Sequence, residues 1–177
     1  MRSSQLVKMT CTIARSVDAI GDPWTIMIMK ELFLGQRRFD DIQMYTGMSP
    51  HLLSVRMKKL EKRGIVQRRA YQQRPTRYEY RLTEKGIDLW PILVALKDWS
   101  ARWDKWPEGE PLKIRHKACG HVVSLKFVCS HCDAPINAGH RTLTSHTAAL
   151  PFYMDGAGPG TRTGQSRKDA RQVDAPV

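Results

Sequence analysis

Two helical segments joined by a sharp turn constrain the fold of this chain more than any other feature. A short segment with apolar residues at helical spacing, residues 39–45, precedes Thr46-Gly47-Met48, which predicts a tight turn. Ser49 and Pro50 follow, a favourable N-cap and a favourable first helical residue. We therefore expect a short helix, a turn, and a second helix over residues 50–63.

The second helix has a buried face and an outward face. Leu53, Met57 and Leu60 are spaced four and three residues apart, so they share the buried face. At about 100° per residue, the outward positions are His51, Ser54, Val55, Lys58 and Lys62, with Arg56 and Lys59 on the flanks. Such a helix is either an ordinary solvated surface or a helix that lies in a DNA major groove. On the DNA hypothesis, the candidates for contacts with base edges are Ser49, His51, Ser54 and Val55, and those for phosphates include Arg56, Lys58 and Lys59.

A β-hairpin is predicted directly after this helix. Residues 66–71 and 78–82 are β-prone runs joined by a polar loop, residues 72–77, which contains Arg74 and Arg77. Tyr78, Tyr80 and Leu82 alternate, and we expect them to point inward. A hairpin after a basic second helix is typical of a winged helix, whose tip can reach the DNA backbone or minor groove. The alternative is a charged turn without a contact.

Positive charge is concentrated in this region. The 177 residues carry 29 Lys and Arg against 17 Asp and Glu, and residues 36–85 alone hold a net charge of +8 of the total +12. A localised basic face favours a polyanionic partner, above all nucleic acid, because counterion release drives such binding. Apolar runs such as residues 26–29 are far shorter than the roughly 20 residues that span a bilayer. We expect a cytoplasmic protein without a membrane partner.

The flanking segments suggest a dimer. A first helix is expected over residues 11–20, and another runs from the Asp22 N-cap to Gly35. A long helix over residues 84–106, bent near Pro91, would be too long for one small domain to bury. Its apolar seam comprises Leu89, Leu93, Leu96, Trp99, Trp103 and Trp106. This seam either pairs with the first helix across a two-fold axis or folds back on its own subunit.

A separate group of residues has the spacing of metal ligands. His116 and Cys119 form one pair and Cys129 and Cys132 form a second pair. Two such pairs suit a tetrahedral structural zinc ion, and a segment of about 32 residues has little core without one. The alternatives are a metal-free thiol cluster or a reversible disulfide between Cys129 and Cys132. The nearby His121, His131 and His140 could each replace His116.

Residues 11–106 resemble the HxlR-type winged helix-turn-helix transcriptional regulators of bacteria and archaea. The matching positions are Cys11, Ile20-Gly21, Trp24, Gly35, Arg38-Phe39, Ser49-Pro50, Leu53, Leu60, Gly64, Arg68, Tyr71, Pro75, Tyr78-Glu79-Tyr80, Leu82-Thr83, Gly86, Pro91 and Trp99. The resemblance implies homodimers that bind inverted-repeat promoter sites, with an effector that stays unknown, and we add Arg38 to the predicted DNA surface. It also makes Cys11 a redox-sensing candidate, since some members sense electrophiles or oxidants through a thiol there; the alternative is a packed, inert thiol near the dimer seam. Arg15 would favour the thiolate, although Thr12 stands where the family commonly has proline.

The predicted fold is mainly α with a small β-hairpin (α+β), a winged helix-turn-helix with a small zinc-ribbon-like C-terminal module. The expected divisions are an N-terminal arm over 1–10, a DNA-binding and dimerisation domain over 11–108, a Cys/His-rich module over 112–143, and a disordered tail over 144–177. The predicted function is transcription regulation without enzymatic activity. A zinc-ribbon RNA-binding or protein-bridging adaptor is the alternative.

Overall fold

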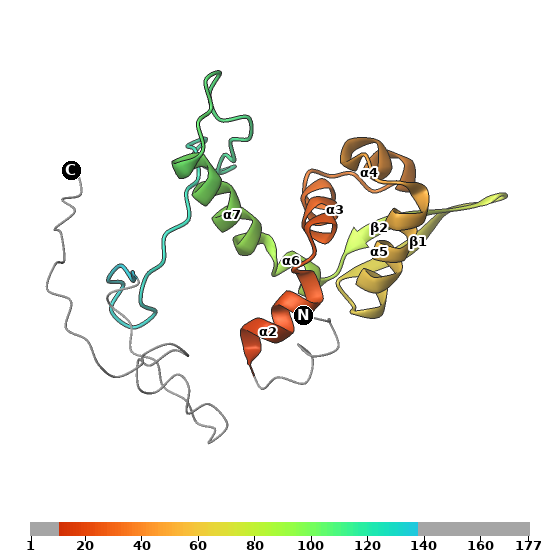
Figure 1. Cartoon of the computed structure of the whole chain (residues 1–177), viewed down its shortest axis with the longest axis horizontal. Coiled ribbons are helices and arrows are strands. Elements are labelled where there is room, and N and C mark those ends of the chain that lie inside the picture. The colour runs from red at the N-terminus through yellow and green to blue at the C-terminus, as the bar shows by residue number, and fades with distance from the viewer. Residues whose placement is uncertain (1–10, 138–177) are drawn as a thin grey trace, which may run out of the picture. The chain divides into compact units, whose positions relative to one another are not determined.

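The structure, a computed structural model, describes residues 11–137. Within this range, helices precede and follow one antiparallel hairpin (Figure 1). The elements are α2 (Thr12–Ile20), α3 (Pro23–Phe33), α4 (Phe39–Thr46), α5 (Pro50–Lys62), β1 (Val66–Gln73), β2 (Thr76–Leu82), α6 (Glu84–Ile87) and α7 (Trp90–Trp103). The predicted winged helix-turn-helix is confirmed. The predicted N-terminal arm, the disordered tail, His140 and the end of the Cys/His-rich module lie outside the described residues.

The helix starts follow the predicted capping pattern. The Asp22 carboxylate accepts a hydrogen bond from the backbone N–H of Thr25 at 3.1 Å, and the Ser49 hydroxyl accepts one from Leu52 at 3.3 Å. Each cap is followed by a proline in the first turn. Gly47, which ends α4, has a φ of +68°, a conformation that glycine adopts without strain. Local sequence therefore determines the sharp turn between α4 and α5.

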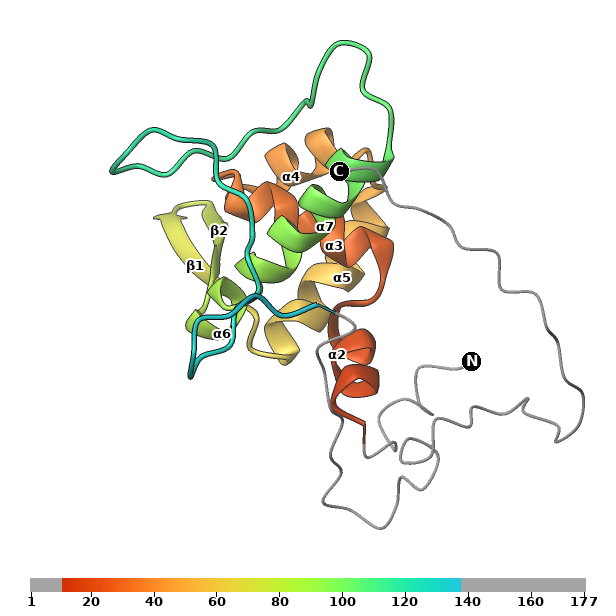
Figure 2. The ribbon, with the colours of Figure 1, turned by 90° about the vertical axis from the view of Figure 1, so that its left-hand side faces the viewer.

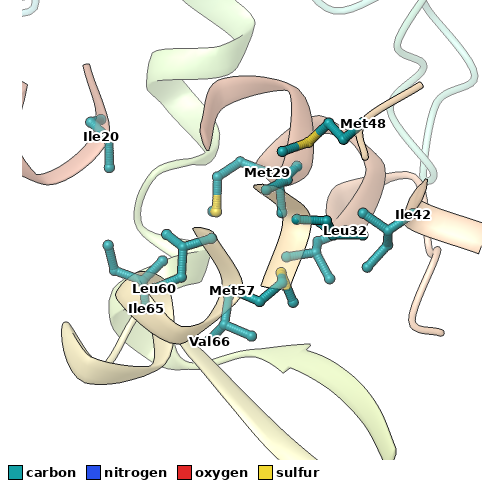
Figure 3. Packing of buried hydrophobic residues seen from close by; sticks show 11 residues of the cluster. Ile20, Met29, Leu32, Ile42, Met48, Met57, Leu60, Ile65 and Val66 are labelled. Carbon is teal, nitrogen blue, oxygen red and sulfur yellow. The ribbon is translucent and has the colours of Figure 1, made fainter. Parts of the chain in front are cut away.

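The hydrophobic core lies between α3, α4 and α5. Leu53, Met57 and Leu60 are at most 1% exposed, as their spacing predicts. Figure 3 shows Met57 pointing toward Leu32 of α3 in the middle of this cluster. Complete burial of an aliphatic side chain contributes about 1.5–3 kcal/mol, so this stripe fixes which face of α5 turns inward.

The hairpin is longer and more exposed than predicted. Pairing runs from Val66 with Leu82 to Gln73 with Thr76, so the loop is only Arg74-Pro75 instead of six residues. The hairpin extends beyond the helices (Figure 1), and only its base reaches the core. The expectation that Tyr78 points inward is therefore wrong: it is 40% exposed.

The predicted long helix is broken into two. The Thr83 hydroxyl caps α6 by accepting the N–H of Gly86 at 3.2 Å, and α6 ends at Ile87. Pro91 lies in the first turn of α7. Because proline cannot donate a backbone hydrogen bond and clashes with the carbonyl four residues earlier, the chain stops and restarts here instead of bending. Trp106, predicted as the last seam residue, lies beyond the end of α7.

The chain divides after Phe127 into two units. In the first unit, residues 104–127 contain an isolated bridge between Arg115 and Val122, and the described part of the second unit contains one between Val128 and Pro135. Within residues 112–137 no strand forms apart from these two isolated bridges. Between residues 11 and 137, no helix has the length and apolar character needed to cross a membrane.

Candidate nucleic-acid interface

The outward face of α5 is open to solvent. His51, Val55, Lys58 and Lys62 are exposed, on the side opposite to the buried stripe. Ser54 is half-buried, and the Ser49 hydroxyl serves as the cap of α5. The N-terminal half of this face thus presents an imidazole and a branched apolar side chain, and the C-terminal half presents two ammonium groups. Lys62 was predicted to point outward but was not named among the phosphate-binding candidates. Its exposure adds it to that group.

Two other predicted phosphate contacts are engaged inside the molecule. Arg56 forms an ion pair with Asp22 at 2.8 Å, and Lys59 donates a hydrogen bond to the backbone carbonyl of Asp18 at 3.2 Å. Arg63 pairs with the Asp18 carboxylate. These three cations link the flank of α5 to α2 and to the start of α3. Sequence periodicity alone could not identify their partners, which are more than 30 residues away.

The hairpin carries cations at its tip and fixed charges at its base. Arg74 and Arg77 are exposed, as predicted. Nearer the base, the Arg68 guanidinium lies 4.3 Å from the Tyr78 ring centroid and that of Arg38 lies 5.2 Å from the Tyr71 ring centroid. The guanidinium of Arg38 is therefore stacked on β1 rather than extended away from it.

The segment before α4 anchors the hairpin to the helices. The backbone carbonyl of Arg37 accepts the N–H of Tyr80 at 2.7 Å. The backbones of Arg38 and Glu79 form an isolated antiparallel β-bridge. Burial raises the pKa of the Tyr80 phenol, with a further contribution from the negative charge of Glu61. The hairpin base is thus held in place beside α4 and α5 while its tip projects.

Two acidic residues near this surface, Glu61 and Glu79, are paired with arginines. Glu61 lies 3.8 Å from Arg68, and Glu79 lies 2.7 Å from Arg81. These carboxylates are therefore partly neutralised and do not cancel the charge of Lys58 and Lys62. The outward face of α5 and the hairpin tip together form a positive surface that suits a phosphate backbone.

Apolar side chains of α2 and α7 remain exposed. On α2 these are Ile13 and Val17, and on α7 they are Leu96, Trp99 and Trp103, the last being 69% exposed. In contrast, Leu89 and Leu93 pack against the core of their own subunit. The predicted seam is therefore divided. Leu89 and Leu93 fold back onto the core of the same chain, whereas Leu96, Trp99 and Trp103 are left uncovered in the single chain.

Cys11 is the N-cap residue of α2 and is half-buried. The backbone N–H of Arg15 donates to its carbonyl at 3.1 Å. Its thiol therefore lies at the N-terminal end of α2.

The first predicted ligand pair sits in a tight turn. The His116 N–H donates to the His121 carbonyl at 2.9 Å, and the Gly120 N–H donates to the His116 carbonyl at 2.8 Å. Nδ1 of His116 lies 3.3 Å from Sγ of Cys119. Gly120 has a φ of +71°, which turns the chain back after Cys119.

The second pair, taken by itself, has the same pattern. The Cys129 N–H donates to the Ala134 carbonyl at 2.8 Å, and the Asp133 N–H donates to the Cys129 carbonyl at 2.9 Å. Backbone N–H groups of His131 and Cys132 lower the pKa of the Cys129 thiol. Each turn brings two side chains with ligand chemistry together, although no group of three or more potential ligands forms within residues 11–137.

Comparison with known proteins agrees with this architecture. Residues 19–107 match the model of the HxlR-like helix-turn-helix family. The chain is 37% identical over 131 residues to the uncharacterized HTH-type transcriptional regulator MT3179 of Mycobacterium tuberculosis, covering 74% of this chain and 83% of the relative. It is 36% identical over 94 residues to the regulator sll1512 of Synechocystis, covering 52% of this chain and 70% of that protein.

Solved structures show the same relationship. The crystal structure of PA1607, a proposed transcription factor, superposes with a TM-score of 0.72 at 27% identity, covering 79% of this chain and 98% of PA1607. The redox regulator HypR in its oxidized form gives a TM-score of 0.50 at 30% identity, covering 54% of this chain and 100% of HypR. These proteins are regulators and not enzymes. Because the family match covers α3 to α7, including α5 and the hairpin, the chain belongs to the HxlR-like helix-turn-helix family of DNA-binding transcriptional regulators.

Proposed function

We propose that this regulator binds inverted-repeat DNA sites as a homodimer, with α5 in the major groove and the hairpin tip on the adjacent backbone or minor groove. The observation that carries the proposal is the uncovered outward face of α5, which lies opposite a completely buried stripe. A recognition helix contacts base edges mainly through its N-terminal residues. His51 and Val55 have that position, and Lys58 and Lys62 follow toward the phosphates.

The wing adds a second contact in this proposal. Arg74 and Arg77 are exposed at the end of a hairpin that projects from the helices (Figure 1). Long basic side chains at such a tip can bind phosphates without reading sequence. Specificity is therefore assigned to α5, and part of the affinity is assigned to the hairpin.

Variants of α5 test the groove assignment. Lys58→Ala should weaken binding to every duplex and lower the slope of log affinity against log salt by about 1 per chain, because one phosphate contact is lost. His51→Ala should instead change sequence preference, at a cost of about 1–3 kcal/mol on the preferred base pair. Selection from a randomised duplex library, followed by titration at several salt concentrations, measures both effects.

Arg56→Ala is the matched control. Its guanidinium is paired with Asp22, so this change should lower the unfolding midpoint in urea and leave the salt slope unchanged. Equal losses for His51→Ala on all duplexes would contradict the base-reading assignment. Tighter binding of folded RNA than of any duplex at the same salt concentration would contradict the DNA proposal as a whole.

Homodimer formation is supported by the exposed apolar residues of α2 and α7. Trp99 and Trp103 lie four residues apart on one face of α7, and they would leave a large apolar patch in water if the chain stayed single. A two-fold arrangement would also place two reading helices about one DNA turn apart, roughly 34–36 Å.

Trp103→Glu should convert the dimer to a monomer, because the interface would have to bury an unpaired carboxylate. Sedimentation equilibrium should then give the mass of one chain, 20.3 kDa, in place of twice that value. Val55→Glu is the control, since it places the same charge on the exposed face of α5 and should leave the dimer intact. A wild-type chain that sediments as a monomer would refute the dimer.

Thiol sensing by Cys11 is supported by its place at the start of α2 and by the likeness to HypR, which is described as a redox regulator. Hydrogen peroxide should oxidise the Cys11 thiol to a sulfenic acid, with release of water, and change duplex affinity in the wild type. Cys11→Ser should abolish the response, whereas Cys132→Ser should preserve it. If Cys11→Ser responds like the wild type, another residue is the sensor.

A structural zinc ion held by His116, Cys119, Cys129 and Cys132 stays a proposal from the spacing of these residues. It is supported by the same backbone pattern in each of the two turns, which presents imidazole or thiol groups three residues apart. Elemental analysis of the reduced protein should find one zinc per chain, and the double variant Cys129→Ser/Cys132→Ser should contain none. Cys11→Ser should retain the metal. A zinc-free wild type would overturn the assignment.

A further inference from the structure

A cavity of about 460 Å³ lies between α3, α7 and the chain that follows α7. α7 crosses α3 in Figure 2, and residues 106–114 form a third wall. Met27 and Phe33 come from α3, Leu93 and Ala101 come from α7, and Leu112 comes from the third wall. The volume falls within the roughly 300–1,000 Å³ range of small-molecule sites.

Polar contacts hold the third wall in place. Nζ of Lys97 lies 2.7 Å from the Glu110 carboxylate, and the Asp98 carboxylate accepts the backbone N–H of Leu125 at 2.7 Å. These contacts raise the pKa of Lys97 and lower the pKa of Asp98. They fasten the segment after α7 onto that helix, so the cavity has a defined wall on a side where a bare helix pair would be open.

The lining selects an uncharged ligand. Its surface is almost entirely apolar, and Phe33, Trp90 and Trp106 contribute aromatic rings. The two lining cations are already paired, Lys30 with Glu31 at 2.7 Å and Lys97 with Glu110. A charged ligand would have to displace these partners or be buried without one, which is costly. Aromatic walls favour a ligand that itself contains a ring.

Of the α7 residues assigned to the surface for a second copy of the chain, Leu96 also lines the cavity and the two tryptophans do not. Trp99 and Trp103 do not line it, and at about 100° per residue they point to another side of α7 than Lys97 and Ala101 do.

We propose that the cavity between α3, α7 and residues 106–114 binds a small, uncharged, ring-containing apolar molecule. The proposal goes beyond DNA binding and does not depend on it. It makes residues 108–114, which follow the family match, part of a binding site.

The test uses the neutral dye N-phenyl-1-naphthylamine, whose fluorescence rises in apolar surroundings, with the full chain. We expect saturable binding of one dye per chain. Ala101→Trp should fill the cavity and weaken binding by about tenfold or more, a loss of about 1.4 kcal/mol. Arg102→Trp adds the same ring at the neighbouring exposed position and should leave the dye affinity unchanged within about twofold, because the site is not altered.

A second matched pair covers the event that Ala101→Trp does not fold. Leu112→Asp should abolish dye binding, because it introduces a carboxylate into the third wall, whereas Lys113→Asp should not. Circular dichroism identifies variants that have lost their helices, and a labelled duplex is titrated into the same samples.

Two results would overturn the proposal. One is a wild type that binds duplex DNA but shows no saturable dye binding, which would leave the DNA assignment standing. The other is dye binding that appears only in the Trp103→Glu variant, which would assign the cavity to the interface between two copies.

Discussion

The packing of α5 against α3 is the constraint on which the rest of the structure depends. Leu53, Met57 and Leu60 meet the buried side of α3, where Ile28 and Met29 are at most 1% exposed. A helix with one fully buried stripe has no freedom to rotate, because turning it would expose several apolar side chains at about 1.5–3 kcal/mol each. The orientation of His51, Val55 and Lys58 toward solvent follows directly.

Polar contacts at the edge of the core complement this packing. Asp22 caps α3 and also pairs with Arg56, and the segment around Asp18 receives Lys59 and Arg63. The basic character of α5 therefore serves two purposes. Cations on its flank fix the helix to α2 and α3, while those on its outward face remain available to a polyanion.

Much of the fold could be predicted because it is specified locally. The caps Asp22 and Ser49, the glycine at 47 and the stripe of α5 each depend on residues a few positions apart. Long-range contacts could not be predicted in this way. The pairing of Arg56 with Asp22 and the exposure of Tyr78 depend on tertiary arrangement, and the break before α7 depends on how completely Pro91 interrupts the helix. The metal-ligand pairs were also predicted from local spacing. The structure shows that each pair lies in its own hydrogen-bonded turn.

A photo-crosslinking measurement tests the central claim most directly, namely that the outward face of α5 contacts DNA. p-Benzoylphenylalanine is placed either at Val55, on that face, or at Ile87, an equally exposed apolar position on α6. With a labelled duplex, our account predicts crosslinks from position 55 that disappear at high salt, and none above background from position 87. Crosslinks from position 87 with none from position 55 would contradict it.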